Sequence, residues 1–201
     1  IGRPGPYAET RPLGIEHVEL DPPGEGEVLV RIRAAGLCHS DLSVIDGNRP
    51  RPMPMVLGHE AAGVVEEVGY GVTSLARGDH VVASFVPSCG HCIPCATGRP
   101  ALCEPGFKAN SAGTLLSGER RLHDTGGHVN HHLGVSGFAQ YAVLAANSLV
   151  RVPSELPFAE AALFGCAVIT GVGAVVNTAA MPHGASAAVI GLGGVGLAAL
   201  L

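Results

Sequence analysis

Tryptophan is absent from the sequence, Lys108 is the only lysine, and aromatic residues make up 4% of the chain. The arginines are scattered, so no basic run is dense enough to follow a phosphate backbone. Because the net charge is also −5, we do not expect a nucleic acid partner.

Long apolar runs are also missing. Glycines, prolines and His183 interrupt the apolar stretches before they reach the roughly 20 residues that a membrane helix needs. The first residues do not combine a basic patch with an apolar export segment. These absences predict a soluble, cytoplasmic protein with no membrane partner.

Glycine and proline are abundant instead, at 29 and 15 of 201 residues. Glycine permits positive φ and proline fixes φ near its value in turns, so this composition favours short strands joined by tight turns. Between Glu27 and about Val150 apolar residues often alternate with others, as at Val28, Val30 and Ile32, which is the pattern of half-buried strands. Three further β-rich runs are predicted at Ala62–Val68, His80–Val86 and Phe138–Leu144.

The composition of the sequence changes after Pro153. Alanine-rich stretches at Phe158–Phe164 and Thr170–Ala180 predict helices. A short apolar run, Ala185–Ile190, then leads into a glycine-rich turn at residues 191–196 and a helical fragment, which is the opening of a Rossmann unit. One strand cannot bury its apolar faces without the rest of a parallel sheet, so we expect the chain to be part of a longer protein.

Four cysteines, Cys89, Cys92, Cys95 and Cys103, are spaced C-x2-C-x2-C-x7-C. Such a loop can wrap one zinc ion in a closed tetrahedron of thiolates, and backbone N–H groups must then donate to the sulfurs to offset the negative charge. An iron–sulfur cluster and disulfides are the alternatives, although the bacterial ferredoxin run closes with a shorter spacing. Structural zinc is the favoured interpretation.

Cys38, His59 and Cys166 form a second candidate metal set. Cys38 follows an apolar strand, and Cys166 lies where the composition changes to alanine-rich stretches. His59 follows Gly58, and a glycine there would allow close approach to an ion. Two cysteines and one histidine leave a fourth zinc position open for water or substrate, as in a catalytic site. Spacing alone leaves this assignment open, because a single buried cysteine is usually a small hydrophobe.

Five motifs, in order, resemble the zinc-containing medium-chain alcohol dehydrogenases, including their liver-type and glutathione-dependent formaldehyde dehydrogenase branches. The motifs are G-L-C-H-S-D (36–41), G-H-E-A-A-G (58–63), the four-cysteine loop, G-C-A-V-I-T-G (165–171) and G-L-G-G-V-G (191–196). The resemblance implies an α/β plus β fold class, with a GroES-like β-rich catalytic domain over residues 1–167 and the start of a truncated Rossmann domain over residues 168–201. It also implies a zinc-dependent oxidoreductase that interconverts an alcohol and its aldehyde or ketone with NAD, and that holds two zinc ions per chain.

The resemblance also assigns roles residue by residue. The second candidate set matches the catalytic zinc ligands, and the four-cysteine loop matches the structural ones. Asp41 matches the carboxylate that orients the ligand histidine, Glu60 the acid behind the zinc, and Ser40 the hydroxyl that takes the alcohol proton. The expected cofactor contacts are His39, Thr170, Gly191, Gly193, Gly194, Val195 and Gly196.

Simpler roles stay open for some of these residues. Ser40 and Asp41 could end a strand and cap a helix, Glu60 could be an ordinary carboxylate, and His39 could be a solvated loop residue. Ser43 departs from the liver-type pattern, which has a histidine there as the last proton-relay group. Because Ser43 cannot accept a proton near neutral pH, the relay would end on water or on another group.

Two other functions remain as alternatives. S-(hydroxymethyl)glutathione dehydrogenases carry two acids where this chain has Arg49 and Arg51, whose charge would repel the glutathione amine unless both are merely solvated. A non-enzymatic, crystallin-like relative is the more remote alternative, and the zinc ligand set argues against it. NAD is expected rather than NADP, although the deciding residue would lie beyond Leu201. We expect a homodimer or homotetramer.

The segment from Gly113 to Val135 is predicted to be a loop excursion with a Gly126-Gly127 turn. Its histidines, His128, His131 and His132, are expected to face solvent or a pocket rim rather than to bind a metal.

Overall fold

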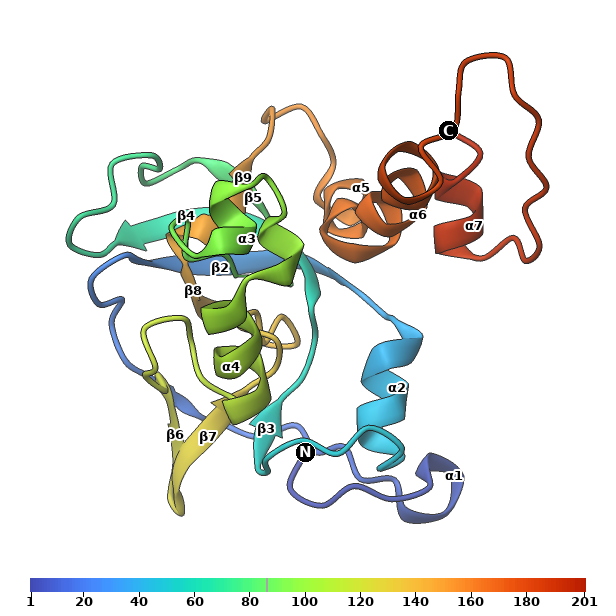
Figure 1. Ribbon diagram of the computed structural model, residues 1–201. Helices are drawn as coiled ribbons and strands as arrows, with labels where there is room; N and C mark the ends of the chain where they lie inside the picture. The colour runs from blue at the N-terminus through green and yellow to red at the C-terminus, as the bar shows by residue number, and fades with distance from the viewer. Residues whose placement is uncertain (86) are drawn as a thin grey trace.

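A computed structural model describes residues 1–85 and 87–201 of the chain. The β-rich part holds two sheets, and a helical arm extends from them at the C-terminal side (Figure 1). This arrangement confirms the β-rich domain followed by helices that the sequence predicts.

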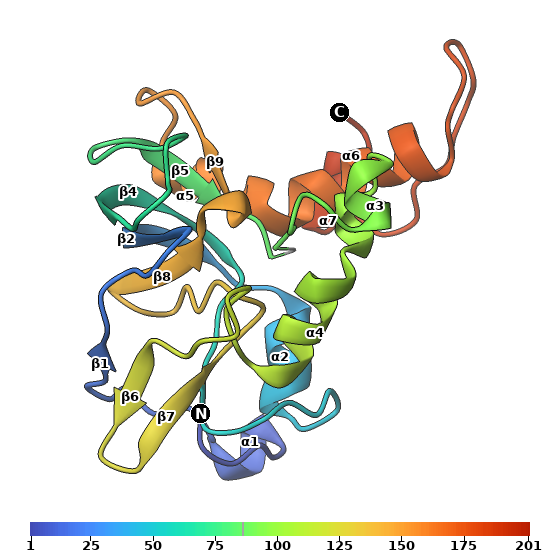
Figure 2. The ribbon, with the colours of Figure 1, turned by 60° about the vertical axis from the view of Figure 1, so that its left-hand side comes forward.

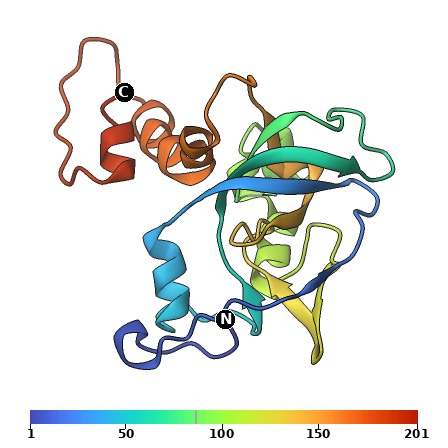
Figure 3. The ribbon, with the colours of Figure 1, turned by 180° about the vertical axis from the view of Figure 1, so that it is seen from behind.

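The larger sheet is antiparallel throughout, with the strand order β8-β2-β4-β5-β9. Its two longest strands lie side by side in the view from behind (Figure 3). The strands are β2 (Glu27–Gly36), β4 (Glu60–Val68), β5 (His80–Ala83), β8 (Tyr141–Ala145) and β9 (Leu149–Arg151).

The main core lies on one face of this sheet. Val28 and Val30 are fully buried in it, whereas the alternate residues Leu29 and Arg31 are partly exposed, so the predicted alternation is confirmed. Burial of each such valine contributes about 1.5–3 kcal/mol. The strand predicted for His80–Val86 ends at Ala83, and Val86 lies outside the described residues.

The smaller sheet has the order β1-β6-β7-β3. Its strands are β1 (Glu19–Leu20), β3 (Met55–Val56), β6 (Leu122–Asp124) and β7 (Gly127–His131). The last two form a hairpin in which Asp124 pairs with Gly127, so the loop predicted for the whole of Gly113–Val135 is wrong here. The hairpin forms because buried Leu122 and Val129 face each other across it.

Short helices connect the strands and precede them. These are α1 (Tyr7–Thr10), α2 (His39–Ile45), α3 (Ile93–Ala96) and α4 (Glu104–Ala112), with 3₁₀ turns η1 (Pro100–Leu102) and η2 (Ala146–Ser148).

The arm begins with a nearly continuous helical run over residues 158–178, which confirms the helices predicted there. It consists of α5 (Phe158–Leu163), the π-helical η3 (Phe164–Val168), α6 (Ile169–Gly173) and the π-helical η4 (Ala174–Thr178). The alanines Ala161 and Ala162 pack against Ala62 and Val82 on the second face of the larger sheet.

This run is 21 residues long, and an 18-residue window within it has a mean hydropathy of 1.9, so by length and composition alone it could cross a membrane. The expectation that no apolar stretch reaches that length is therefore wrong. Gly165, Gly171 and Gly173 lie inside the run without ending it, since a glycine costs a helix only about 1 kcal/mol.

The glycine turn leads into α7 (Gly194–Ala198), which packs against α6 away from both sheets (Figure 2). The strand predicted at Ala185–Ile190 does not form. Within the described residues no strand pairs with this segment, and an unpaired strand leaves its N–H and C=O groups without partners.

Candidate metal centres

Strand pairing brings Cys38 next to His59. In the β2–β4 ladder Gly36, at the end of β2, pairs with Glu60, at the start of β4. Cys38 follows Gly36 by two residues and His59 precedes Glu60 by one, so the antiparallel register carries both to the same end of the sheet.

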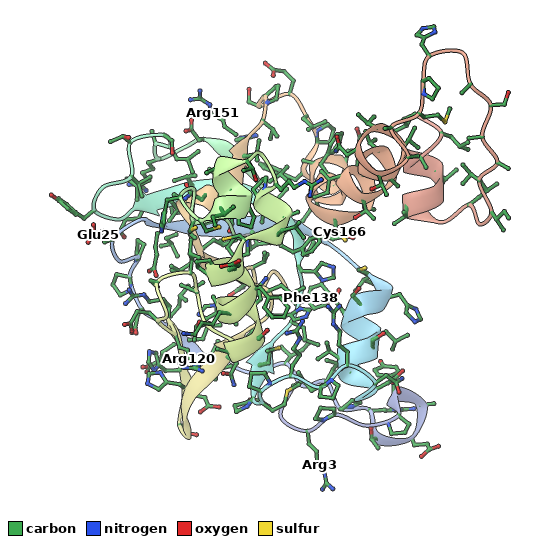
Figure 4. All side chains as sticks on the ribbon, viewed as in Figure 1. Arg3, Glu25, Arg120, Phe138, Arg151 and Cys166 are labelled. Carbon is green, nitrogen blue, oxygen red and sulfur yellow. The ribbon has the colours of Figure 1, made fainter. Side chains whose placement is uncertain are left out.

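Cys166 reaches this end of the sheet from the helical arm. Its neighbour Gly165 packs against the carbonyl oxygen of Ala83, leaving no room for a side chain, and Ala83 pairs with Ala61 on β4. Figure 4 shows Cys166 where the arm meets the strands. One ligand atom from each of four residues lies within 4.8 Å of the others: Cys38, His59, Glu60 and Cys166.

The imidazole of His59 is buried and held by Asp41. The Nδ1 atom of His59 lies 3.1 Å from Oδ1 of Asp41. An ionised carboxylate can only accept, so Nδ1–H donates, and Nε2 keeps the lone pair that a metal requires. Burial lowers the pKa of His59, but hydrogen bonds and charge interactions with Asp41 and Cys166 outweigh it and raise the pKa to about 10. The site thus favours a positive charge, which a metal ion can supply in place of the proton.

Asp41 serves two structural purposes at once. Its Oδ2 accepts from the backbone N–H of Cys38 at 3.3 Å, which caps the first turn of α2. Its Oδ1 faces His59. Burial raises the pKa of Asp41, but the imidazoles of His132 and His59 reverse this effect and hold it well below its usual range. The simpler role as a helix cap and the role of orienting a histidine therefore coexist.

Two glycines shape the same region. Gly58 has φ +93°, and a Cβ there would lie 2.6 Å from the backbone nitrogen of Phe138, so a glycine is required by the protein backbone rather than by an ion. At Gly36 a Cβ would meet the carboxylate of Glu60. Glu60 is buried, and its side chain occupies the space that Gly36 leaves free.

Ser40 lies in the first turn of α2 beside Cys38. Burial raises the pKa of Cys38, but hydrogen bonds from the backbone and hydroxyl of Ser40, together with His59, outweigh this and lower it. The hydroxyl of Ser43 donates to the carbonyl oxygen of His39 at 3.1 Å, so it turns back along the helix. His39 itself is exposed.

The four cysteines of the second cluster also come together. One sulfur from each of Cys89, Cys92, Cys95 and Cys103 lies within 4.8 Å of the others, and all four are free thiols. Three backbone N–H groups donate to these sulfurs: Cys89 and Gly106 to Cys103 at 3.2 and 3.3 Å, and Cys92 to Cys89 at 3.3 Å. The backbone N–H of His91 is the main cause that lowers the pKa of Cys89 to about 6. The N–H donors that a thiolate site needs are therefore present.

Two of the three histidines singled out in the 113–135 segment are buried, contrary to expectation. His128 is exposed, but His131 and His132 are each 1% exposed, so neither faces solvent. At the end of β7, Nε2 of His131 accepts from the backbone N–H of Arg121 at 3.1 Å. Nδ1 of His132 lies 3.2 Å from Oδ1 of Asp41.

The sequence interpretation therefore missed His132. Together with Asp41 and His59 it forms a third group whose ligand atoms lie within 4.8 Å of one another. The available signal was the Gly126-Gly127 pair between two β-rich stretches, which is typical of a hairpin. A hairpin would have indicated that part of this segment is buried.

All the expected cofactor residues except His39, which lies on α2, are on the arm. Gly191 has φ +94°, and a Cβ at Gly196 would meet its carbonyl oxygen, so the turn at 191–196 closes tightly around glycine backbone. Thr170 lies on α6, and its neighbour Gly171 packs against the carbonyl oxygen of Val195. The structure thus brings the helix of Thr170 against the glycine turn.

Two pockets of about 430 and 310 Å³ lie elsewhere. Glu25 and Asn147 line the first, and Ile15 and Pro54 line the second. Neither is lined by a candidate metal ligand, so neither pocket is part of the metal centres.

Comparisons with known proteins agree with this geometry. Residues 24–154 match the alcohol dehydrogenase GroES-like domain family. The chain is 43% identical over 193 residues to alcohol dehydrogenase class-3 of Drosophila melanogaster, covering 96% of this chain and 51% of that protein. It is 43% identical over 189 residues to S-(hydroxymethyl)glutathione dehydrogenase of Synechocystis, covering 94% and 51%.

Among solved structures, benzyl alcohol dehydrogenase from Acinetobacter calcoaceticus is similar with a TM-score of 0.83 and 40% identity, covering 91% of this chain and 49% of that one. The chain spans about half the length of the curated relatives that it matches. Through the matched domain and these relatives, the chain belongs to the zinc-dependent medium-chain alcohol dehydrogenase family.

Proposed function

We propose that the chain supplies the catalytic domain, residues 1–167, and the beginning of the dinucleotide-binding domain, residues 168–201, of an NAD-dependent alcohol dehydrogenase with two zinc ions per chain. The observation that carries this proposal is the convergence of Cys38, His59 and Cys166 from three separate segments. Two thiols and one imidazole suit zinc and leave a fourth position for substrate. The four-cysteine cluster suits a closed, structural zinc.

In this proposal the residues around the catalytic centre hold the ion and move the proton. When bound, zinc would supply a Lewis acid that lowers the pKa of an alcohol hydroxyl, and NAD would supply the hydride acceptor. Cys38 and Cys166 offset the charge of the ion, and Asp41 orients His59. Ser40 lies next to Cys38, where its hydroxyl can accept a hydrogen bond from the alcohol and pass its own proton on as it takes the alcohol proton.

The proton then needs a path outward. Ser43 already donates to the carbonyl oxygen of His39, and its hydroxyl cannot take up an additional proton near neutral pH. We therefore propose that the relay ends on water beyond Ser40. Glu60 stays behind the ligand set as a buried carboxylate.

The cofactor is proposed to lie against the arm. The glycine turn and the start of α7 would hold the pyrophosphate through backbone N–H groups, as glycine turns do in Rossmann units. The residues proposed to contact the cofactor are His39, Thr170, Gly191, Gly193, Gly194, Val195 and Gly196. NAD is proposed rather than NADP on the resemblance alone.

The proposed substrate is an alcohol without a glutathione group. Arg51 is partly buried and donates to the carbonyl oxygen of Asn110 at 3.2 Å, while Arg49 is exposed. Both bring positive charge to positions where the glutathione-dependent branch has acids, and this charge disfavours an ammonium group. A benzyl alcohol dehydrogenase is among the structural relatives, so aromatic alcohols belong in the test.

A substrate panel tests this proposal. Ethanol, benzyl alcohol and S-(hydroxymethyl)glutathione are each assayed with NAD and with NADP by nicotinamide absorbance, using the full-length protein. We expect NAD reduction with simple alcohols. Turnover of the glutathione adduct alone would support that alternative, and no turnover despite full zinc occupancy would support a non-enzymatic relative.

We further propose that the protein forms a homodimer or homotetramer and lies in the cytoplasm.

A further inference from the structure

The carboxylate of Asp41 is surrounded by donors from three parts of the chain. The backbone N–H of Gly58 donates to Oδ1 at 3.3 Å, and Nδ1–H of His59 donates to the same oxygen at 3.1 Å. The third group is His132, whose Nδ1 lies 3.2 Å from this oxygen. His132 comes from the segment that follows β7, so it joins the smaller sheet to the metal centre.

The ring of His132 has no competing partner. Within residues 1–85 and 87–201, its buried Nδ1 has no partner in full hydrogen-bonding geometry, and the contact with Oδ1 of Asp41 at 3.2 Å meets the distance of an ion pair. The ring meets that of His59 edge to face, with centroids 5.5 Å apart at 86°. Because the carboxylate can only accept, a proton on Nδ1 of His132 is the arrangement that satisfies both groups.

A tight turn holds His132 in this position. Its backbone N–H donates to the hydroxyl of Ser136 at 3.0 Å, and its carbonyl oxygen accepts from Val135 and Ser136 at 3.0 and 3.2 Å. Leu133 and Ser136 adopt φ values of 53° and 52°, which residues with a Cβ rarely adopt. The turn is therefore maintained at some cost in backbone energy, and it fixes the point from which the His132 side chain enters the site.

We propose that His132 is a positioning residue for the metal centre: its Nδ1–H donates to Asp41 and fixes the carboxylate that orients His59. The inference rests on the proposed function, since it concerns the zinc site formed by Cys38, His59 and Cys166. Groups that orient metal ligands from outside the ligand set typically change metal affinity by 10–100-fold when replaced. For His132 we expect a change near tenfold, because it acts on the metal ligand through Asp41.

His131 provides a matched control. It precedes His132 in the chain and is equally buried, but its ring accepts from the backbone of Arg121 and does not face Asp41. His131→Leu and His132→Leu thus remove the same ring from neighbouring buried positions. Only the second removes a contact with Asp41.

The test measures how fast each of the two zinc ions leaves the full-length zinc-loaded protein in excess chelator, with the melting temperature recorded for each variant. We expect His132→Leu to speed the release of one zinc ion about tenfold and to leave the other unchanged. His131→Leu should lower the melting temperature without this effect. His132→Asn should restore slow release, because its amide nitrogen stands near the position of Nδ1.

Three results would overturn the inference: wild-type release in His132→Leu, equally fast release in His131→Leu, or no rescue by His132→Asn. If His132→Leu does not fold, the pair His132→Asn and His132→Gln decides, since the amide of glutamine reaches the Nε2 position instead and should not rescue. A wild-type protein with two zinc ions and alcohol turnover upholds the proposed function whichever way these variants behave.

Discussion

The two candidate metal centres are built in opposite ways. The four-cysteine cluster draws all its ligands from residues 89–103, and its sulfurs accept N–H groups of the same local segment. The centre at Cys38, His59 and Cys166 takes one ligand from each of three distant segments and is surrounded by buried polar side chains. The first centre therefore depends on its own loop, and the second depends on the whole fold. This difference predicts that loss of the first costs stability, while loss of the second costs chemistry.

The largest effect should follow Cys166→Ala. Removing this ligand should raise the activation barrier by several kcal/mol, because the Lewis acid is lost. Turnover should therefore fall about a thousandfold or more. The helical arm should stay in place, since Ala161 and Ala162 make its buried contacts with the sheet. Initial rates and melting temperature measure the two effects. A Cys166→Ala protein that unfolds would contradict the separation of roles.

Cys103→Ala should instead reduce stability. Cys103 is 1% exposed and accepts two backbone N–H groups, so it is the most embedded ligand of its cluster. A closed structural zinc contributes folding free energy, and its loss should cost several kcal/mol. For a protein of this size, that lowers the melting temperature by about 10 °C or more. An unchanged melting curve for Cys103→Ala would remove the basis for calling this zinc structural.

The contrast between the centres also explains what the sequence could predict. The spacing of Cys89, Cys92, Cys95 and Cys103 lies within one loop, so their proximity follows from local geometry. The proximity of Cys38 to Cys166 does not, because it depends on the β2–β4 register and on the packing of the arm. Residue types and local context make that second set a candidate, and only the family resemblance assigns it as the catalytic zinc site.

Other differences have similar causes. His132 was missed because its partner Asp41 lies 91 residues away in the sequence and meets it only through the turn after β7. The sequence suggests that Gly58 makes room for an ion, whereas in the structure the backbone of Phe138 requires a glycine there. The strand predicted at Ala185–Ile190 depends on neighbouring strands, and none pairs with it in the described part of the chain.

A third prediction tests stability at His131, which belongs to neither set of candidate zinc ligands. Burial lowers the pKa of His131 to about 4, although the charge of Glu27 opposes this. In the unfolded chain a histidine titrates near about 6.5. Below that pH the unfolded state binds a proton that the folded state does not, so His131 reduces stability as the pH falls from about 6.5 to about 4.

Between pH 7 and pH 5, His131 should lower the free energy of unfolding by about 2 kcal/mol, because 1.5 pH units of this interval lie below the pKa of histidine in the unfolded chain. His131→Asn cannot titrate there, so its unfolding free energy should fall less over this interval. Urea unfolding at both pH values measures the difference. Metal loss in acid affects both proteins alike, and parallel pH dependences would mean that His131 is not held neutral.

The smallest effect is expected at the proton relay of the assembled centre. Ser43→His should introduce a group that titrates near about 6.5 and raise turnover a few-fold near neutral pH. Ser43→Ala is the control, and it should behave like the wild type because the native hydroxyl is bonded to His39. Identical pH–rate profiles for the two variants would show that the proton leaves by a route that avoids position 43.

The central claim is that two separate zinc centres lie in this chain, and elemental analysis of the purified full-length protein tests it most directly. The account predicts two zinc ions per chain in the wild type, and one in Cys166→Ala with the melting temperature largely retained. A single zinc ion in the wild type, or iron in place of zinc, would contradict it.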